Sequence, residues 1–284
     1  MNPTRHAIGL GLRRGWTEFL LSLRSAQDQG FYVFMGGATL LYLWLNRDSE
    51  VPGTDLLLPT VALPSMLGAL LAFGVIIGPA SSLAMEREDG TLLRHKALPH
   101  GMQGYVTGQL LLHSLGLVPL LLVILVPGFL LFDGLMSGGA SGWLTFAWVL
   151  VLGLLATLPL GMILGSVVPG VQKIGTWGML PVLLVTGISG IFAPLQLLWG
   201  WLQVVAQVFP MYWIGLGMRS AFLPDAAAAV ELGGSWRTGT TVLVLVAWAV
   251  FGLLVTPRVL RRMARKQSGS QVQEAREAAL QWVK

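Results

Sequence analysis

The chain has 284 residues, of which 54% are hydrophobic and only 11% are charged, and its mean hydropathy is +0.71. A soluble domain carries about 25% charged residues, so this composition excludes one and indicates a membrane protein with several spans. The net charge of +5 lies in segments that flank apolar stretches, which argues against nucleic acid as a partner. The absence of cysteine rules out disulfides and cysteine-bound zinc.

Residues 1–28 predict an amphipathic helix that lies in the membrane interface. Apolar side chains recur there at steps of three and four residues, whereas Arg13, Arg14 and Glu18 lie largely on other faces. A basic helix of this kind beside a membrane span usually lies flat at the lipid surface. The segment can serve as a topology signal at the same time. The apolar face comprises Ile8, Leu12, Trp16, Phe19, Leu20 and Leu23.

Six apolar stretches follow, and we predict an all-α polytopic membrane protein with six transmembrane helices in residues 31–259. The whole of residues 1–284 would then form a single transmembrane domain. A helix needs about 20 apolar residues to cross the hydrocarbon layer at 1.5 Å per residue. The first stretch is short, and the second contains three prolines. The predicted spans are residues 31–45, 56–83, 105–132, 143–168, 176–192 and 240–259.

A dense group of charges, residues 85–101, separates the second span from the third, and we call it the charged connection. Its charges must lie outside the lipid. Asp89 can accept a hydrogen bond from a free amide at a helix start, and Pro99 ends a helix because it lacks a donor. These signals predict a short helix over Thr91–Ala97. Such a helix is also common in plain solvated loops, so the spacing alone leaves its role open.

Residues 193–239 lie between the fifth and sixth spans. They begin with an apolar part that is rich in aromatic residues and too short to span the membrane without strain. Aromatic rings favour the membrane interface, and non-helical backbone at membrane depth must be covered by protein. We therefore predict a re-entrant or interfacial pair of helices that packs on the bundle. The residues that mark this re-entrant segment are Pro194, Trp201, Pro210 and Tyr212.

Fifteen of the eighteen lysines and arginines fall on one side of the membrane if six spans are assumed. Positive residues concentrate on the cytoplasmic side. The count therefore puts both termini, the charged connection and the basic tail of residues 260–284 in the cytoplasm, and the aromatic segment outside. The localisation that follows is multi-pass, in the plasma (inner) membrane. The basic residues left on the outer side are Arg47, Arg219 and Arg237.

The sequence shows no catalytic centre. It has no phosphate-binding glycine loop ending in Lys-Ser or Lys-Thr, no His-Glu-x-x-His zinc motif and no paired carboxylates in a span. We expect that the chain is not an enzyme and that it binds no metal or other cofactor. His113, in the third span, either relays protons or bonds a neighbouring helix, and the second role is the commoner one.

Several features together carry a resemblance to a known family. The charged connection contains Glu-Arg-Glu-Asp-Gly-Thr at residues 86–91, and residues 189–194 read Ser-Gly-Ile-Phe-Ala-Pro. With the basic amphipathic N-terminus and the six-span layout, they resemble the ABC-2 type permeases of ATP-binding-cassette exporters over nearly the whole chain. In size the chain is similar to permeases of the daunorubicin and multidrug export kind. The proline-rich second span departs from the common pattern.

The resemblance implies a permease subunit that works with a second protomer, identical or different, and with a separate ATPase that binds ATP and Mg²⁺. Its substrate would be a hydrophobic or amphipathic, drug-like compound. The alternatives are a lipid or polysaccharide carrier as substrate, or a membrane enzyme or assembly factor without transport. The charged connection would be the coupling helix that docks on the ATPase, through Glu86, Glu88, Asp89, Gly90, Thr91 and Leu93. Spans two and five would border the export path, with Met66, Phe73, Met179 and Thr186 as candidate lining residues.

Overall fold

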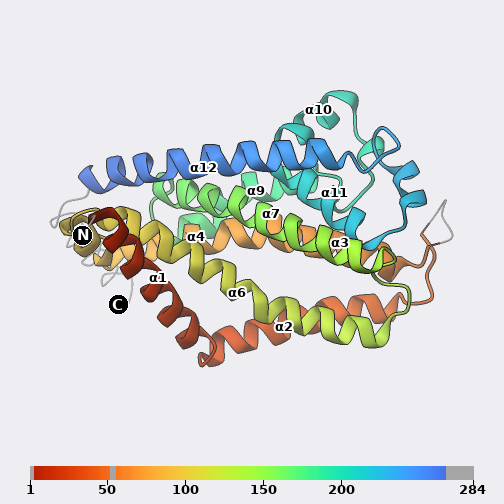
Figure 1. The fold of residues 1–284 in the computed structure, drawn as a ribbon, viewed down its shortest axis with the longest axis horizontal. Coiled ribbons are helices and arrows are strands. Elements are labelled where there is room, and N and C mark those ends of the chain that lie inside the picture. The colour runs from red at the N-terminus through yellow and green to blue at the C-terminus, as the bar shows by residue number, and fades with distance from the viewer. Residues whose placement is uncertain (1–2, 52–55, 267–284) are drawn as a thin grey trace.

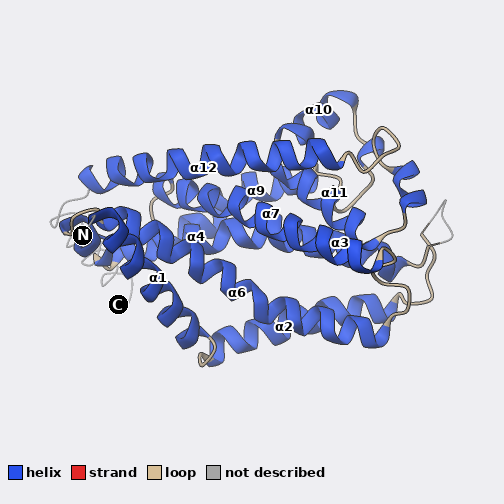
Figure 2. Cartoon of the chain, in the orientation of Figure 1, coloured by secondary structure: helices blue, strands red, loops and turns tan. Residues whose placement is uncertain are grey.

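The computed structural model describes residues 3–51 and 56–266, and every regular element in these ranges is a helix (Figure 1). Figure 2 shows the long helices running side by side along one direction, joined by short loops. We call the end that carries the N-terminus and the charged connection the charged end, and the opposite end the loop end. The long helical stretches are α2 (Ala26–Leu45), α3 (Leu58–Ala69) continued by η1 (Leu70–Gly74) and α4 (Val75–Glu88), α6 (Gly101–Leu131), α7 (Gly139–Val167), α8 (Val171–Lys173) continued by η2 (Ile174–Gly178) and α9 (Met179–Gly187), and α12 (Thr238–Lys266).

Four of these stretches are long and apolar enough to cross a membrane by length and composition. They are Leu58–Glu88, Gly101–Leu131, Gly139–Val167 and Thr238–Arg265, which match predicted spans two, three, four and six. The first turns of α2 are polar, with Asp28 and Gln29, and α8–α9 is a shorter stretch. The count of six spans therefore stays a prediction, although helices do occupy all six predicted positions.

Several predicted boundaries are wrong by a few residues, each for a local reason. Helix α1 (Pro3–Ser22) ends before residue 28, because Ser25 caps α2 by accepting a hydrogen bond from the Asp28 amide at 3.3 Å. Helix α4 does not stop at Leu83 but continues through the charges to Glu88, since no glycine or proline interrupts it there. At the other end of the chain, α12 runs on to Lys266, and the rest of the predicted tail lies outside the described residues.

Helix α1 packs along the first half of α6 through glycines rather than through its apolar face. Gly11 and Gly15 lie directly against the carbonyl oxygens of Gly104 and Gly108. Small residues four positions apart let two helix backbones approach closely. The apolar face identified from the sequence stays largely uncovered by protein, as a face turned toward lipid would be. Its exposed members are Leu12, Trp16, Leu20 and Leu23.

The segment between α9 and α12 folds onto the bundle at the loop end (Figure 1). Helix α9 ends at Gly187 rather than at residue 192, and a turn leads to η3 (Leu195–Leu197) and α10 (Gly200–Val208). Helix α11 (Pro210–Phe222) packs on α3, α7 and α12, and η4 (Asp225–Val230) follows it. The predicted pair of helices is thus present and packed on the bundle, while its depth in a membrane stays a prediction.

Candidate docking helix at the charged end

The short helix predicted in the charged connection is α5, and its bounds of Thr91–Ala97 are confirmed. A carboxylate oxygen of Asp89 accepts a hydrogen bond from the Thr91 amide at 2.8 Å. Gly90 has a φ of 79°, a backbone conformation that glycine adopts without a steric cost, and it allows α5 to start directly after α4. Leu98 is extended, as the residue before Pro99 should be. Local sequence signals therefore define both ends of α5.

One side chain, that of Leu92, fixes α5 to the bundle. It is fully buried in a cluster with apolar side chains from four other helices. Burying a leucine is worth roughly 1.5–3 kcal/mol relative to leaving it exposed. Leu92 therefore places α5 in direct contact with those helices. Its partners in the cluster include Leu83 of α4, Tyr105 of α6, Met162 of α7 and Leu260 of α12.

Glu86 points into the molecule. One of its carboxylate oxygens accepts hydrogen bonds from the guanidinium of Arg14 at 2.9 Å and from the side-chain amide of Gln109 at 3.0 Å. Only 14% of its side chain is exposed. The reason is that α4 continues beyond Leu83, which places Glu86 between α1 and α6. This residue links three helices of its own chain instead of presenting a free carboxylate at the surface.

Arg14 of α1 contacts four side chains at the charged end. Its guanidinium donates to Glu18 at 2.6 Å and to Glu86, meets Nε2 of His95 in α5, and lies over the ring of Tyr105. Burial lowers the pKa of Arg14, but Glu18 and Glu86 outweigh that effect and hold the pKa above its ordinary value. Burial and the adjacent Arg14 charge both lower the pKa of His95, which favours the neutral ring that can accept a hydrogen bond.

Arg87 and Glu88 attach the end of α4 to the turn between α7 and α8. Arg87 donates to the carbonyl oxygens of Gly165, Ser166 and Val168 at 3.0–3.4 Å, at the C-terminal end of α7. A cation is favourable there because the free carbonyl groups carry partial negative charge. Glu88 accepts a hydrogen bond from the Val171 amide at 3.0 Å. Arg87 therefore joins the end of α4 to the end of the fourth predicted span, and Glu88 joins it to the start of α8, just before the fifth.

The outer surface of the charged connection carries charges of both signs and exposed apolar side chains. Leu98 and Met85 are 56% and 57% exposed, which is unusual for large apolar side chains beside so much charge. Among the residues named from the sequence, Glu88 and Asp89 are exposed although each accepts a hydrogen bond, and Gly90, Thr91 and Leu93 are half-buried. The other exposed residues of this surface are Arg94, Lys96, Ala97, Pro99 and His100.

The structure disperses the candidate lining residues. Thr186 is buried within its own chain, where its hydroxyl donates to the Val182 carbonyl at 2.8 Å. Phe73 and Met66 are half-buried against two different apolar clusters, and Met179 is half-buried in the first turn of α9. What η2 and α9 leave uncovered is a row of apolar side chains. This row consists of Trp177, Leu180, Leu183 and Leu184.

The residues that mark the aromatic segment fall into an exposed and a buried set. Pro194, just before η3, and Trp201, in the first turn of α10, are exposed, whereas Pro210 opens α11 and is buried together with Tyr212. A buried ion pair between Arg219 of α11 and Glu231 holds this segment, with contacts of 2.5 and 3.1 Å. The Arg219 guanidinium also donates to the carbonyl oxygen of Gly190 at 3.1 Å. The prediction that Arg219 is an outer-loop charge is wrong in that the side chain lies inside the protein.

A family model described as "ABC-2 type transporter" matches residues 20–223. The matched stretch contains the charged connection, α5 and the α10–α11 pair, and it covers most of the chain. No curated protein matches the chain.

Proposed function

The chain belongs to the ABC-2 type transporter family, and we propose that it is the permease subunit of an exporter powered by a separate ATPase. The family makes it a membrane component of an ABC transporter. The observation that carries the proposal further is the geometry of α5. This helix is capped at its start, anchored by Leu92, and turned outward with Arg94 and Leu98 exposed. A small rigid helix of this kind suits docking in a groove of a partner subunit.

The contacts of α5 supply a route for coupling. ATP binding would close the ATPase dimer and displace α5, and Leu92 would carry that displacement into α4, α6, α7 and α12. His95 would carry it to α1 through Arg14, and Arg87 with Glu88 would carry it from α4 to the start of α8. ATP and Mg²⁺ would be bound by the ATPase, and the permease would perform no covalent chemistry. The proposed docking residues remain Glu88, Asp89, Gly90, Thr91 and Leu93, with Glu86 acting from inside.

The uncovered apolar row on α9 supports pairing with a second permease protomer, identical or different. Leu180, Leu183 and Leu184 would meet the partner through side-chain packing. Gly175 and Gly187 at the two ends of this stretch, where nothing lies within 4 Å of an added Cβ, would let a partner helix approach closely. A path between protomers would be bordered by α3–α4 and α9. The apolar character of these helices favours a hydrophobic or amphipathic, drug-like substrate. A lipid or polysaccharide carrier is the alternative cargo of the same architecture.

The basic charged end is proposed to face the cytoplasm of a cell whose plasma (inner) membrane holds the protein, with the α10–α11 pair re-entrant from outside. Cysteines placed singly in this cysteine-free chain test the orientation. Those at the exposed positions Ser49 and Ser235 should react with an impermeant thiol reagent in intact cells, and one at Ala97 should not. External labelling at Ala97 would reverse the orientation and remove α5 from the reach of a cytoplasmic ATPase.

Co-purification tests the function itself. The tagged chain should recover an ATPase subunit encoded in the same genome, one with a phosphate-binding glycine loop, and the complex should hydrolyse ATP. The chain purified alone should show no ATP hydrolysis above a mock preparation, because it has no such loop. Hydrolysis by the chain alone, or failure to recover any ATPase under conditions where the membrane is solubilised gently, would contradict the proposal.

A further inference from the structure

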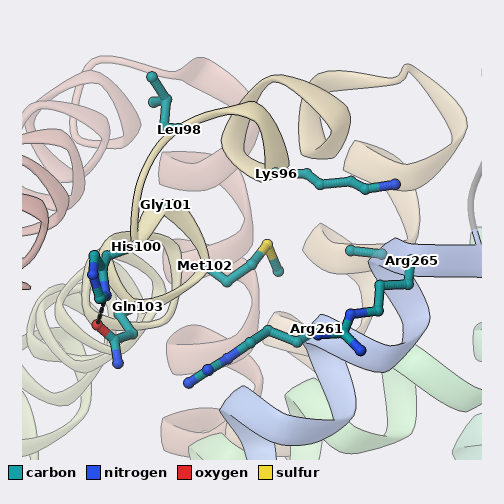
Figure 3. A pocket seen from close by; sticks show the side chains of 9 residues that line it. Lys96, Leu98, His100, Gly101, Met102, Gln103, Arg261 and Arg265 are labelled. Carbon is teal, nitrogen blue, oxygen red and sulfur yellow. Dashed lines mark hydrogen bonds between the residues drawn. The ribbon is translucent and has the colours of Figure 1, made fainter.

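A pocket of about 400 Å³ opens at the charged end between the turn that joins α5 to α6 and the last turns of α12 (Figure 3). Three cations line it, namely Lys96 from α5 and Arg261 and Arg265 from α12, and none of the lining residues is acidic. The volume is far larger than the roughly 30 Å³ that one water molecule occupies in the liquid. The pocket therefore has room for a polyatomic anion.

The two arginines are four positions apart and so project from one face of α12. Among the residues that the structure describes, neither Arg261 nor Arg265 forms a salt bridge with a carboxylate. In Figure 3 the Arg261 side chain extends toward Gln103, and the side chains of Lys96 and Arg265 lie on the other side of Met102. Like charges at this spacing repel one another, and an anion between them would remove that repulsion. The start of α6 adjoins the pocket and adds the partial positive charge of a helix N-terminus.

The position of the pocket along α12 points to the kind of anion. The outward side chains of α12, including Val250, Phe251 and Leu254, are apolar and exposed, as lipid-facing residues are. Arg261 lies seven residues beyond Leu254, or about 10 Å at 1.5 Å per residue. That distance reaches from the hydrocarbon into the headgroup layer. Met102 and Ala264 add an apolar part to the wall of the pocket.

We propose that this pocket binds the phosphate group of an anionic membrane lipid, held by Arg261, Arg265 and Lys96. A lipid fits better than a free anion because the exposed apolar surface of α12 leads directly to the arginines and accommodates an acyl chain. Basic pockets between membrane helices on the cytoplasmic side are suited to such headgroups. The bound lipid would bridge α12 to the turn that follows α5. The proposal does not depend on the coupling role of α5.

The test compares two double variants of the full chain, purified in detergent. Arg261→Gln with Arg265→Gln removes two charges from the pocket, and Arg258→Gln with Arg262→Gln removes two exposed charges of the same helix that do not line it. Phosphatidylglycerol and phosphatidylcholine are titrated separately. Bound lipid is counted by native mass spectrometry, and Tm is followed in parallel. Equal Tm values for all three proteins in phosphatidylcholine would establish that the variants fold.

Phosphatidylglycerol should bind the unmodified chain in preference to phosphatidylcholine and raise its Tm. The pocket variant should lose roughly 30-fold in affinity for the anionic lipid, and the control variant less than about fivefold. Equal losses in the two variants, or no preference for the anionic lipid, would overturn the proposal. If inorganic phosphate raises the Tm at the same concentration as the lipid does, the ligand of the pocket is a free anion and not a lipid. If the pocket variant binds lipid normally but no longer recovers the ATPase, the two arginines contact the ATPase subunit and not a lipid.

Discussion

The charged connection and the segment between α9 and α12 both place short helices between long apolar ones, but they are held in different ways. In the charged connection a single leucine, Leu92, is buried in α5, and polar contacts from Arg14, Arg87 and Glu88 secure the surroundings. In the other segment, residues 210–219 of α11 are buried without a break. The first is a helix attached to the outside of the bundle, and the second is part of the core.

This difference separates two kinds of role. A helix that keeps an exposed outer face and is held to the bundle through few side chains, here Leu92 and His95, can be contacted by a partner and can transmit its movement. A helix that is buried on all sides stabilises the fold and resists movement. Substitutions in the aromatic segment should therefore act mainly through stability. Substitutions in the charged connection should act mainly through the partner subunit and leave folding largely intact.

The largest effect on stability is expected at the buried ion pair of the aromatic segment. Arg219→Ala leaves the Glu231 carboxylate buried and without its partner, which should cost about 3–5 kcal/mol. The matched control is Arg47→Ala, which breaks an exposed pair with Asp48 and should cost less than about 1 kcal/mol. Thermal unfolding in detergent and the yield in membranes measure both. Equal stability of the two variants would show that the segment is not held by this pair.

A smaller effect is expected at the glycine contact between α1 and α6. The Cβ added by Gly11→Ala would overlap the carbonyl oxygen of Gly104. The substitution should therefore push the two helices apart, at a cost of about 1–3 kcal/mol. Gly9→Ala adds the same methyl group where nothing lies within 4 Å, and it should stabilise α1 by up to about 1 kcal/mol. We expect the Tm to fall in Gly11→Ala and to rise in Gly9→Ala. A loss of stability in both variants would mean that helix propensity does not govern α1 at all.

The smallest effect concerns pH. Because the pKa of His95 is lowered in the folded chain, the unfolded chain binds more protons between the two pKa values. The contact with Arg14 is therefore fully present above about pH 6.5, the ordinary value for histidine. It weakens as the pH falls through the lowered pKa. Protonation of His95 should therefore lower stability as the pH falls through this window, while Glu86, whose pKa burial raises to about 7, acts in the opposite direction. Relative to the unmodified chain, His95→Asn should remove the His95 contribution to the slope, while His100→Asn at an exposed position should leave the slope unchanged. Identical slopes in all three proteins would rule out His95 as the group responsible.

The sequence defined α5 well because its signals are local. Asp89, Gly90 and Pro99 act on neighbouring backbone groups, so their effect can be predicted without knowing the rest of the fold. The contacts that give α5 a role are not local. Arg14 and Glu86 are 72 positions apart in the chain, and nothing in the spacing of either residue indicates the other. The continuation of α4 to Glu88 is not predicted from the sequence, so the inward direction of Glu86 is not predicted either.

The packing of α1 could have been predicted and was not. Gly11 and Gly15, like Gly104 and Gly108, follow the small-xxx-small pattern of close helix contacts. The apolar face is the more obvious pattern in this segment, yet apart from Phe19 most of it is exposed. The burial of Arg219 had no such signal, because a charge in a segment with aromatic residues looks like an interfacial residue. Only its pairing with Glu231 makes burial tolerable.

The most direct test of the coupling proposal breaks one short helix at each end of the molecule. Leu93→Pro removes the amide that donates to the Gly90 carbonyl oxygen at 3.1 Å in the first turn of α5. Val204→Pro removes a mid-helix hydrogen bond in α10, at a local cost of roughly 3 kcal/mol. Recovery of a co-expressed ATPase on the tagged permease is measured at equal membrane levels of both variants. We expect Leu93→Pro to lose most of the ATPase and of the transport, and Val204→Pro to retain the ATPase. Full recovery and normal transport with Leu93→Pro would show that α5 is a plain loop helix.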